Sequence, residues 1–183
     1  LAEGYASNEK QKFEKDLNRF VDYFFEQEPY KSQKNDFNIY GVFKPSEESG
    51  TDLPGADIFV NTVLNTTFWT LGSERYLMTE DNLSMRNLAA HVPYDAIYIQ
   101  VNHPRYGGGG IYNQYCTYTT DNQFAKYLFT HEFGHSFTGL ADEYYTSDVA
   151  YNDFFKPTVE PVEPNITALL DPKNVKWKKY LSD

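Results

Sequence analysis

The sequence predicts one α+β domain (α/β-like), because patterns typical of helices and of strands alternate along it. Its 183 residues are enough for one hydrophobic core and too few to favour two domains. Apolar residues recur at helical spacing in residues 7–29 and 122–139, whereas residues 37–43 and 95–101 alternate apolar with small or polar side chains. These two periodicities in one chain are typical of a mixed fold.

The first predicted helix begins at Ser7, whose hydroxyl can cap it, and ends near Pro29, which disfavours helical geometry in the residue before it. Its apolar positions share one face of the helix: Phe13, Leu17, Phe20, Val21 and Phe24. Residues 37–43 then predict a strand with one face toward the core.

Weaker patterns follow in the middle of the chain. Residues 46–55 combine Pro, Gly and acidic residues, and they predict a loop. Residues 58–71 are β-branched and aromatic, and they predict a mixture of strand and turn. Residues 81–90 predict a short helix that Pro93 halts.

Two strand patterns flank a glycine run. Residues 95–101 are the best strand in the sequence, and adjacent apolar positions in it indicate an internal strand. The glycines of residues 106–111 lead into a second strand pattern at residues 111–119. Such a run either lets another backbone approach closely or forms a flexible hairpin turn, and the sequence supports both interpretations about equally.

The last predicted helix begins after Asn122, a capping residue, and ends at Gly139, because glycine readily adopts the left-handed conformation that terminates helices. The tail from Lys156 is rich in proline, and residues 174–181 are amphipathic.

The composition of the chain argues against nucleic acid and membrane partners. The chain has 16 basic and 26 acidic side chains and a formal charge of -10, which repels nucleic acid phosphates and anionic membranes. It contains no apolar run of about 18 residues, so we expect no membrane span. Cys116 is the only cysteine, which excludes an intrachain disulfide and a cysteine-based zinc site. We expect it to be a small buried hydrophobe.

The stretch THEFGHSFTGLADEY, residues 130–144, indicates a zinc site on the last helix. His131 and His135 are four residues apart and project from one helix face, so both can bind one ion. Glu132 stands beside the ion, where it can act as general base toward a water molecule whose pKa the metal lowers to about 7. Imidazole ligands and a reaction without redox chemistry favour Zn²⁺.

A catalytic zinc site that keeps one position open needs a third protein ligand. In the metzincin pattern H-E-x-x-H-x-x-G-x-x-H, the glycine position is Thr138 here and the ligand position is Ala141. Gly139 stands one residue later, however, and Asp142 follows it after the same three-residue step. Asp142 is therefore the first candidate for the third ligand.

Three other carboxylates compete with Asp142. Glu143 is the second candidate, because an altered turn could aim it inward. Glu160 and Glu163 are more distant alternatives, and their proline-rich surroundings argue against the helix that such a ligand needs. Residues 142–143 could also form an exposed acidic turn or hold a histidine by a hydrogen bond.

The zinc motif and several other segments resemble the IgA-peptidase-like family of bacterial metallopeptidases, family M64. These segments extend over essentially the whole chain: HEFGHSFTGLADEYY, residues 3–5 (EGY), residues 37–40, residues 106–111, and residues 174–180 with Trp177. The resemblance implies a zincin or metzincin-like catalytic domain, in which a twisted mixed β-sheet lies above an active-site helix that carries HExxH. It also implies a secreted, cell-surface or periplasmic bacterial zinc endopeptidase.

The resemblance has two further consequences. In such folds an edge strand above the cleft pairs with extended substrate. The resemblance thereby implies that Gly108, Gly109, Gly110 and Ile111 bind the substrate. Metzincin-like enzymes also place a methionine turn after the zinc motif, but Met78 and Met85 both precede it. We therefore expect residues 1–183 to be a single catalytic domain that lacks a C-terminal segment.

The expected function is a zinc-dependent endopeptidase that acts on protein or peptide substrates. His131, His135 and Asp142 are the expected zinc ligands, and Glu132 is the expected general base. The phenol of Tyr144 or Tyr145 is a candidate donor to the oxyanion. The alternative is a non-catalytic extracellular domain that binds protein or glycan and retains a zinc site. A third interpretation is an exopeptidase with the same chemistry.

Overall fold

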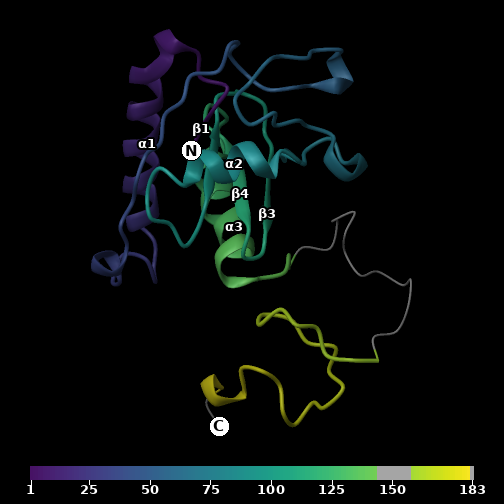
Figure 1. The fold of residues 1–183 in the computed structure, drawn as a ribbon. Helices are drawn as coiled ribbons and strands as arrows, with labels where there is room; N and C mark the ends of the chain where they lie inside the picture. The colour runs from purple at the N-terminus through teal and green to yellow at the C-terminus, as the bar shows by residue number, and fades with distance from the viewer. Residues whose placement is uncertain (144–157, 182–183) are drawn as a thin grey trace.

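A four-stranded mixed sheet forms the centre of the fold (Figure 1). The computed structural model describes residues 1–143 and 158–181. The strands lie in the order β1-β2-β4-β3, with these bounds: β1 Ala2–Glu3, β2 Tyr98–Val101, β3 Gly108–Ile111 and β4 Tyr115–Thr119. β1, β2 and β4 are parallel, and β3 pairs with β4 in the antiparallel direction. β2 is internal, as predicted.

The described residues also form three α-helices: α1 Lys10–Phe25, α2 Asn82–Ala89 and α3 Ala125–Thr138. This combination of helices and a mixed sheet confirms the predicted α+β class. None of the described helices is long and apolar enough to cross a membrane.

The sheet separates two hydrophobic clusters. Ile99 and Tyr115 point to the side of α2, where they pack with Met85 and Leu88. Aromatic residues of α1 and α3 cover the other side: Phe20, Phe24, Phe129 and Phe133 pack there with Cys116 and Tyr118 of β4. Neighbouring residues of a strand point to opposite faces, so one short strand serves both clusters. Cys116 is fully buried, as predicted.

α1 confirms the first predicted helix, although Ser7 does not cap it. Ser7 lies inside a 3₁₀ turn, Ser7–Glu9, and the Glu9 carboxylate accepts a hydrogen bond from the Ala6 N–H at 2.8 Å. The α-helix begins only at Lys10. The prediction missed this because a cap depends on the backbone geometry of the preceding turn as well as on residue type.

The predicted strand at residues 37–43 is wrong. Within the described part of the chain, its backbone makes one hydrogen bond outside its own turn, from the Ala2 N–H to the Val42 carbonyl at 3.0 Å. The neighbouring β1 spans only two residues, so no ladder forms along the segment. Ile39 and Tyr40 accordingly remain exposed.

The glycine run is itself a strand. The sequence predicted that residues 106–111 lead into a strand at residues 111–119, but Gly108–Ile111 forms β3, and a turn at residues 112–114 joins it to β4. The hairpin turn therefore lies after the glycines. The glycines instead let helix α3 approach closely, as one of the two sequence interpretations held.

The remaining predicted elements agree with the structure in part. α2 matches residues 81–90, and the Asp81 carboxylate caps it by accepting the Ser84 N–H at 2.9 Å. Residues 46–55 form a loop with a 3₁₀ turn at its end, and residues 58–71 contain isolated bridges and another 3₁₀ turn. Of the amphipathic residues 174–181, only Lys178–Tyr180 is helical, as one 3₁₀ turn.

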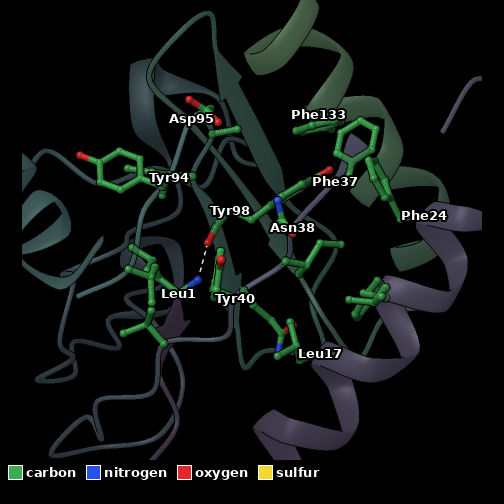
Figure 2. A pocket seen from close by; sticks show the side chains of 18 of the residues that line it. Leu1, Leu17, Phe24, Phe37, Asn38, Tyr40, Tyr94, Asp95, Tyr98 and Phe133 are labelled. Atoms are coloured by element: carbon green, nitrogen blue, oxygen red, sulfur yellow. Dashed lines mark hydrogen bonds between the residues drawn. The ribbon is translucent and has the colours of Figure 1, made fainter. Parts of the chain in front are cut away.

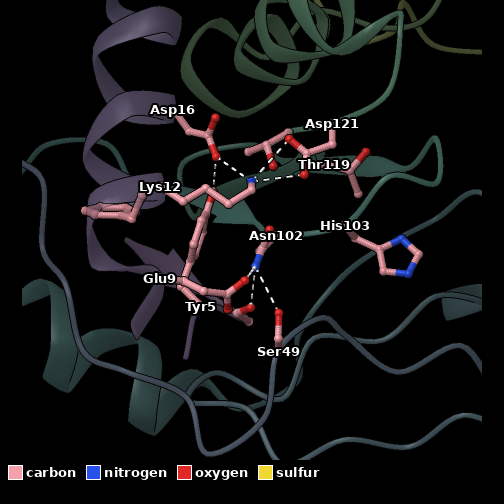
Figure 3. Close-up of polar contacts among 12 residues, drawn as sticks. Tyr5, Glu9, Lys12, Asp16, Ser49, Asn102, His103, Thr119 and Asp121 are labelled. Carbon is pink, nitrogen blue, oxygen red and sulfur yellow. Dashed lines mark hydrogen bonds and ion pairs between the residues drawn. The ribbon is translucent and has the colours of Figure 1, made fainter. Parts of the chain in front are cut away.

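A polar network joins α1 to the ends of β1 and β2 (Figure 3). Asp16 accepts hydrogen bonds from the Tyr5 hydroxyl at 3.0 Å and from the Lys12 ammonium at 2.7 Å. Asn102, which follows β2, donates to the Glu9 carboxylate at 3.0 Å. These charged side chains are partnered with one another, so they serve to fix the helix on the sheet.

Candidate metal centre

Helix α3 presents His131 and His135 on one face. Their Nε2 atoms lie 3.1 Å apart. The helix ends as predicted at Gly139, which has a left-handed φ of 67°. The Gly139 and Leu140 N–H groups donate back to the carbonyls of His135 and Gly134, at 3.1 and 3.2 Å. This left-handed cap turns the chain back toward the two histidines.

The returning chain brings Asp142 onto the histidines. Its Oδ1 atom lies 3.1 Å from Nε2 of His131 and 3.1 Å from Nε2 of His135. The three atoms therefore form a triangle with equal sides. Zinc bonds of about 2.0–2.1 Å at the tetrahedral angle place neighbouring ligand atoms about 3.3 Å apart. The residues present thus fit three of the four ligand positions of a tetrahedral zinc site.

Hydrogen bonds orient both imidazole rings. Nδ1 of His135 lies 2.5 Å from the Leu140 carbonyl, which can only accept, so Nδ1 is the protonated nitrogen. In a neutral ring Nε2 then carries the lone pair that a metal needs. On the other ring, Nδ1 of His131 lies 3.3 Å from the Tyr127 hydroxyl, and the Tyr127 ring stacks on the imidazole at 5.3 Å between centroids.

Glu132 lies beside these atoms and is only 7 % exposed. One carboxylate oxygen of Glu132 and one nitrogen of each histidine lie within 4.8 Å of one another. Burial raises the pKa of Glu132 to about 7, against the opposing charges of His131 and His135. In the metal-free protein burial lowers the pKa of His135, but the Asp142 carboxylate and the Leu140 carbonyl outweigh it and raise that pKa to about 9.

Two of the three competing carboxylates, those of Glu143 and Glu160, have hydrogen-bond partners in the C-terminal segment. Glu143 accepts a hydrogen bond from Nδ2 of Asn165 at 2.7 Å. The Glu160 carboxylate accepts the N–H groups of Ala168 and Leu170, at 3.0 and 2.9 Å. Glu163 belongs to the same C-terminal segment, where its carbonyl accepts a hydrogen bond from a lysine. Tyr144 and Tyr145, the candidate oxyanion donors, lie outside the described residues.

Strand β3 packs against α3 through its glycines. A Cβ atom added at Gly108 would lie 3.1 Å from Cγ of Glu132, and one at Gly110 would lie 2.5 Å from the Glu132 carbonyl oxygen and 2.8 Å from Cβ of His135. Any other residue at Gly110 would therefore displace α3 from the strand. The close approach is possible only because glycine has no side chain.

The outer edge of β3 is partly occupied. The N–H of Gly108 donates to the Arg75 carbonyl at 3.2 Å, and the Gly108 carbonyl accepts from Leu77 at 3.1 Å. Gly109 and Ile111 direct their peptide groups toward β4, because they alternate with Gly108 along the strand. Gly110 faces the same edge as Gly108, and its peptide groups pair with none of residues 1–143 and 158–181.

Comparison with known proteins agrees with the resemblance seen in the motifs. A family model described as IgA peptidase M64 matches residues 1–183, the whole chain. The chain belongs to the IgA peptidase M64 family. No curated protein matches it. Membership in this M64 family points to a metallopeptidase, and it makes the cluster on α3 the expected reactive centre.

A cavity in the described part of the M64 chain lies apart from this centre. A cavity of about 440 Å³ lies between α1, residues 36–42 and the start of β2 (Figure 2). Phe129, Phe133 and Phe137 line it from α3, but neither histidine of the motif does. The cavity is therefore on the opposite side of the helix from His131 and His135.

Sequence reasoning missed three side chains at the M64 centre. Tyr127 precedes His131 by one helical turn, so the helical spacing itself could have identified it. The Arg75 carbonyl accepts the Gly108 N–H, and the Arg75 charge lowers the pKa of Glu132; no sequence pattern indicates this pairing. Asn165 contacts the turn that carries Asp142 from 24 residues away along the chain, with no local signal.

Proposed function

We propose that the protein is a zinc-dependent endopeptidase that hydrolyses peptide bonds of extracellular proteins. One observation supports this most directly: two imidazole nitrogens and one carboxylate oxygen lie 3.1 Å from one another, next to a buried glutamate. This nitrogen and oxygen set suits zinc among the common biological metals. The secreted or surface setting in a bacterium rests on the family resemblance.

His131, His135 and Asp142 would hold the ion. When bound, zinc acts as a Lewis acid that makes water a nucleophile near neutral pH and stabilises negative charge on the carbonyl oxygen. Glu132 takes the proton from the attacking water and passes it to the leaving amine. Its pKa of about 7 in the metal-free protein is close to the value that makes a general base most effective at neutral pH.

Strand β3 would bind the substrate backbone. Gly110 presents its N–H and C=O at the sheet edge, next to the helix residues Glu132 and His135. An extended peptide that pairs with Gly110 is therefore held beside the general base. Gly108, Gly109 and Ile111 support this role by fixing the strand between β4 and residues 75–77.

Metal analysis combined with cleavage of an unfolded protein tests the proposal. We expect about one zinc per chain and internal cleavage by the native sequence. Glu132→Ala should keep the zinc and lose cleavage by a factor of about 10³ or more, since it removes the base. Asp142→Ala should lose zinc, whereas Glu143→Ala should retain it.

Three results would contradict the proposal in different ways. Unchanged cleavage by Glu132→Ala would show that another group is the base. Zinc binding without any cleavage would favour the non-catalytic binding domain. Release of single terminal residues would identify an exopeptidase instead.

A further inference from the structure

The turn that carries Asp142 is held by one side chain from the C-terminal segment. The Asn165 amide oxygen accepts the Ala141 N–H at 2.9 Å, and its Nδ2 donates to the Ala141 carbonyl at 2.9 Å. Nδ2 also lies 2.7 Å from the Glu143 carboxylate. Asn165 thus contacts the residues on both sides of Asp142.

The segment around Asn165 is itself fixed by two charged side chains. The Glu160 carboxylate binds the N–H groups of Ala168 and Leu170 and the hydroxyl of Thr167. The Lys176 ammonium donates to the carbonyls of Pro161, Glu163 and Ile166. Asn165 therefore lies in a loop whose backbone is held by side-chain hydrogen bonds on both sides of it.

We propose that Asn165 is a positioning residue for the metal centre. The proposal rests on the proposed metal-dependent function. Helix α3 fixes His131 and His135, but Asp142 follows the end of the helix, outside any helix or strand. Asn165 instead forms hydrogen bonds with the backbone beside Asp142. These bonds position the Asp142 carboxylate before an ion binds. Pre-ordering of this kind reduces the entropy that binding must offset.

Three variants test the role of Asn165. Asn165→Ala removes all three contacts. Asn165→Asp keeps the shape and the acceptor for the Ala141 N–H, but it removes both donor contacts and places a second carboxylate next to Glu143. Asn174→Ala is the matched control, because Asn174 is an exposed asparagine of the same segment.

The readouts are zinc affinity, by competition with a chromophoric chelator, and the visible absorption of the cobalt-substituted protein. We expect both Asn165 variants to bind zinc about 10- to 100-fold more weakly and to change the cobalt spectrum. Asn174→Ala should match the native sequence in both. Thermal unfolding of the metal-free proteins checks that all variants fold.

Two outcomes overturn the proposal separately from the proposed function. Native zinc affinity and an unchanged cobalt spectrum in Asn165→Ala would show that Asn165 does not position the ligand. An equal loss in Asn174→Ala would show that the segment acts only through general stability. Absence of zinc binding by the native sequence would instead remove the proposed function itself.

Discussion

The contact between Gly110 and α3 gives a sharp test of how the fold places the metal centre. In Gly110→Ala the new Cβ would lie 2.5 Å from the Glu132 carbonyl oxygen and 2.8 Å from Cβ of His135. These atoms belong to the helix backbone or are attached directly to it, so no side-chain rotation relieves the contact. Ordinary contact needs about 3.5 Å, so the helix and the strand must separate by about 1 Å.

Gly109→Ala is the matched control. Its Cβ would lie 2.1 Å from Sδ of Met78, the far end of a flexible side chain that can rotate away. We expect Gly110→Ala to lower the free energy of unfolding by about 1–3 kcal/mol, which is about 2–12 °C in Tm for a chain of this length. A displacement of about 1 Å at reacting groups should also reduce cleavage about 100-fold.

Thermal unfolding followed by circular dichroism, together with kcat/KM on one peptide, measures both effects. We expect Gly109→Ala to lose less in both. If Gly110→Ala unfolded and cleaved like the native sequence, α3 would not pack on β3 as described. If Gly109→Ala were the more damaged protein, the assignment of the two strand faces would be reversed.

Three further predictions follow from the same centre. Burial raises the pKa of Glu132 from 4.5 to about 7, so the metal-free fold loses stability as the pH rises between these two values, where the unfolded chain has lost the proton and the folded chain still holds it. Glu132→Gln should therefore raise the unfolding free energy by about 2–4 kcal/mol at pH 8 and by little at pH 4, in urea titrations. Zinc must displace the proton of His135, because the pKa of that side chain is about 9 in the metal-free protein. Chelator competition should therefore show a zinc affinity that rises about tenfold per pH unit from pH 6 to 8. A zinc affinity independent of pH would contradict this. Gly139→Ala adds a Cβ at a residue with a φ of 67°, 3.1 Å from the Tyr112 ring, and it should lower the free energy of unfolding in urea by about 1–2 kcal/mol. Gly134→Ala lies in the helix interior, and it should leave that free energy unchanged or raise it by up to about 1 kcal/mol.

Local patterns predicted the parts of the site that depend on neighbours in sequence. The spacing of His131 and His135 places both on one helix face whatever surrounds the helix, and Gly139 ends that helix because glycine accepts a left-handed φ. The distance from Gly139 makes Asp142 the first candidate, and in the structure its Oδ1 atom lies 3.1 Å from Nε2 of both histidines.

Predictions failed where a partner far along the chain decided the outcome. Residues 37–43 alternate like a strand, but a strand needs a neighbouring edge, and β1 offers two residues. The glycines of residues 106–111 are expected to lead into a strand, and the sequence supports a close backbone approach and a flexible hairpin turn about equally. They form a strand because only glycine allows α3 to lie so close.

The sequence by itself determined the mixed helix and strand content, the placement of His131, Glu132 and His135 on α3, and the turn that follows them, because each depends on spacing within a few residues. Only the tertiary structure decided that β3 is the strand against the helix, that the Arg75 carbonyl pairs with Gly108 at the edge of β3, and that Asn165 holds the turn of Asp142. These contacts join residues that are tens of positions apart. Packing and hydrogen bonding across that distance leave no periodic trace in the sequence, which is why they become visible only in the folded chain.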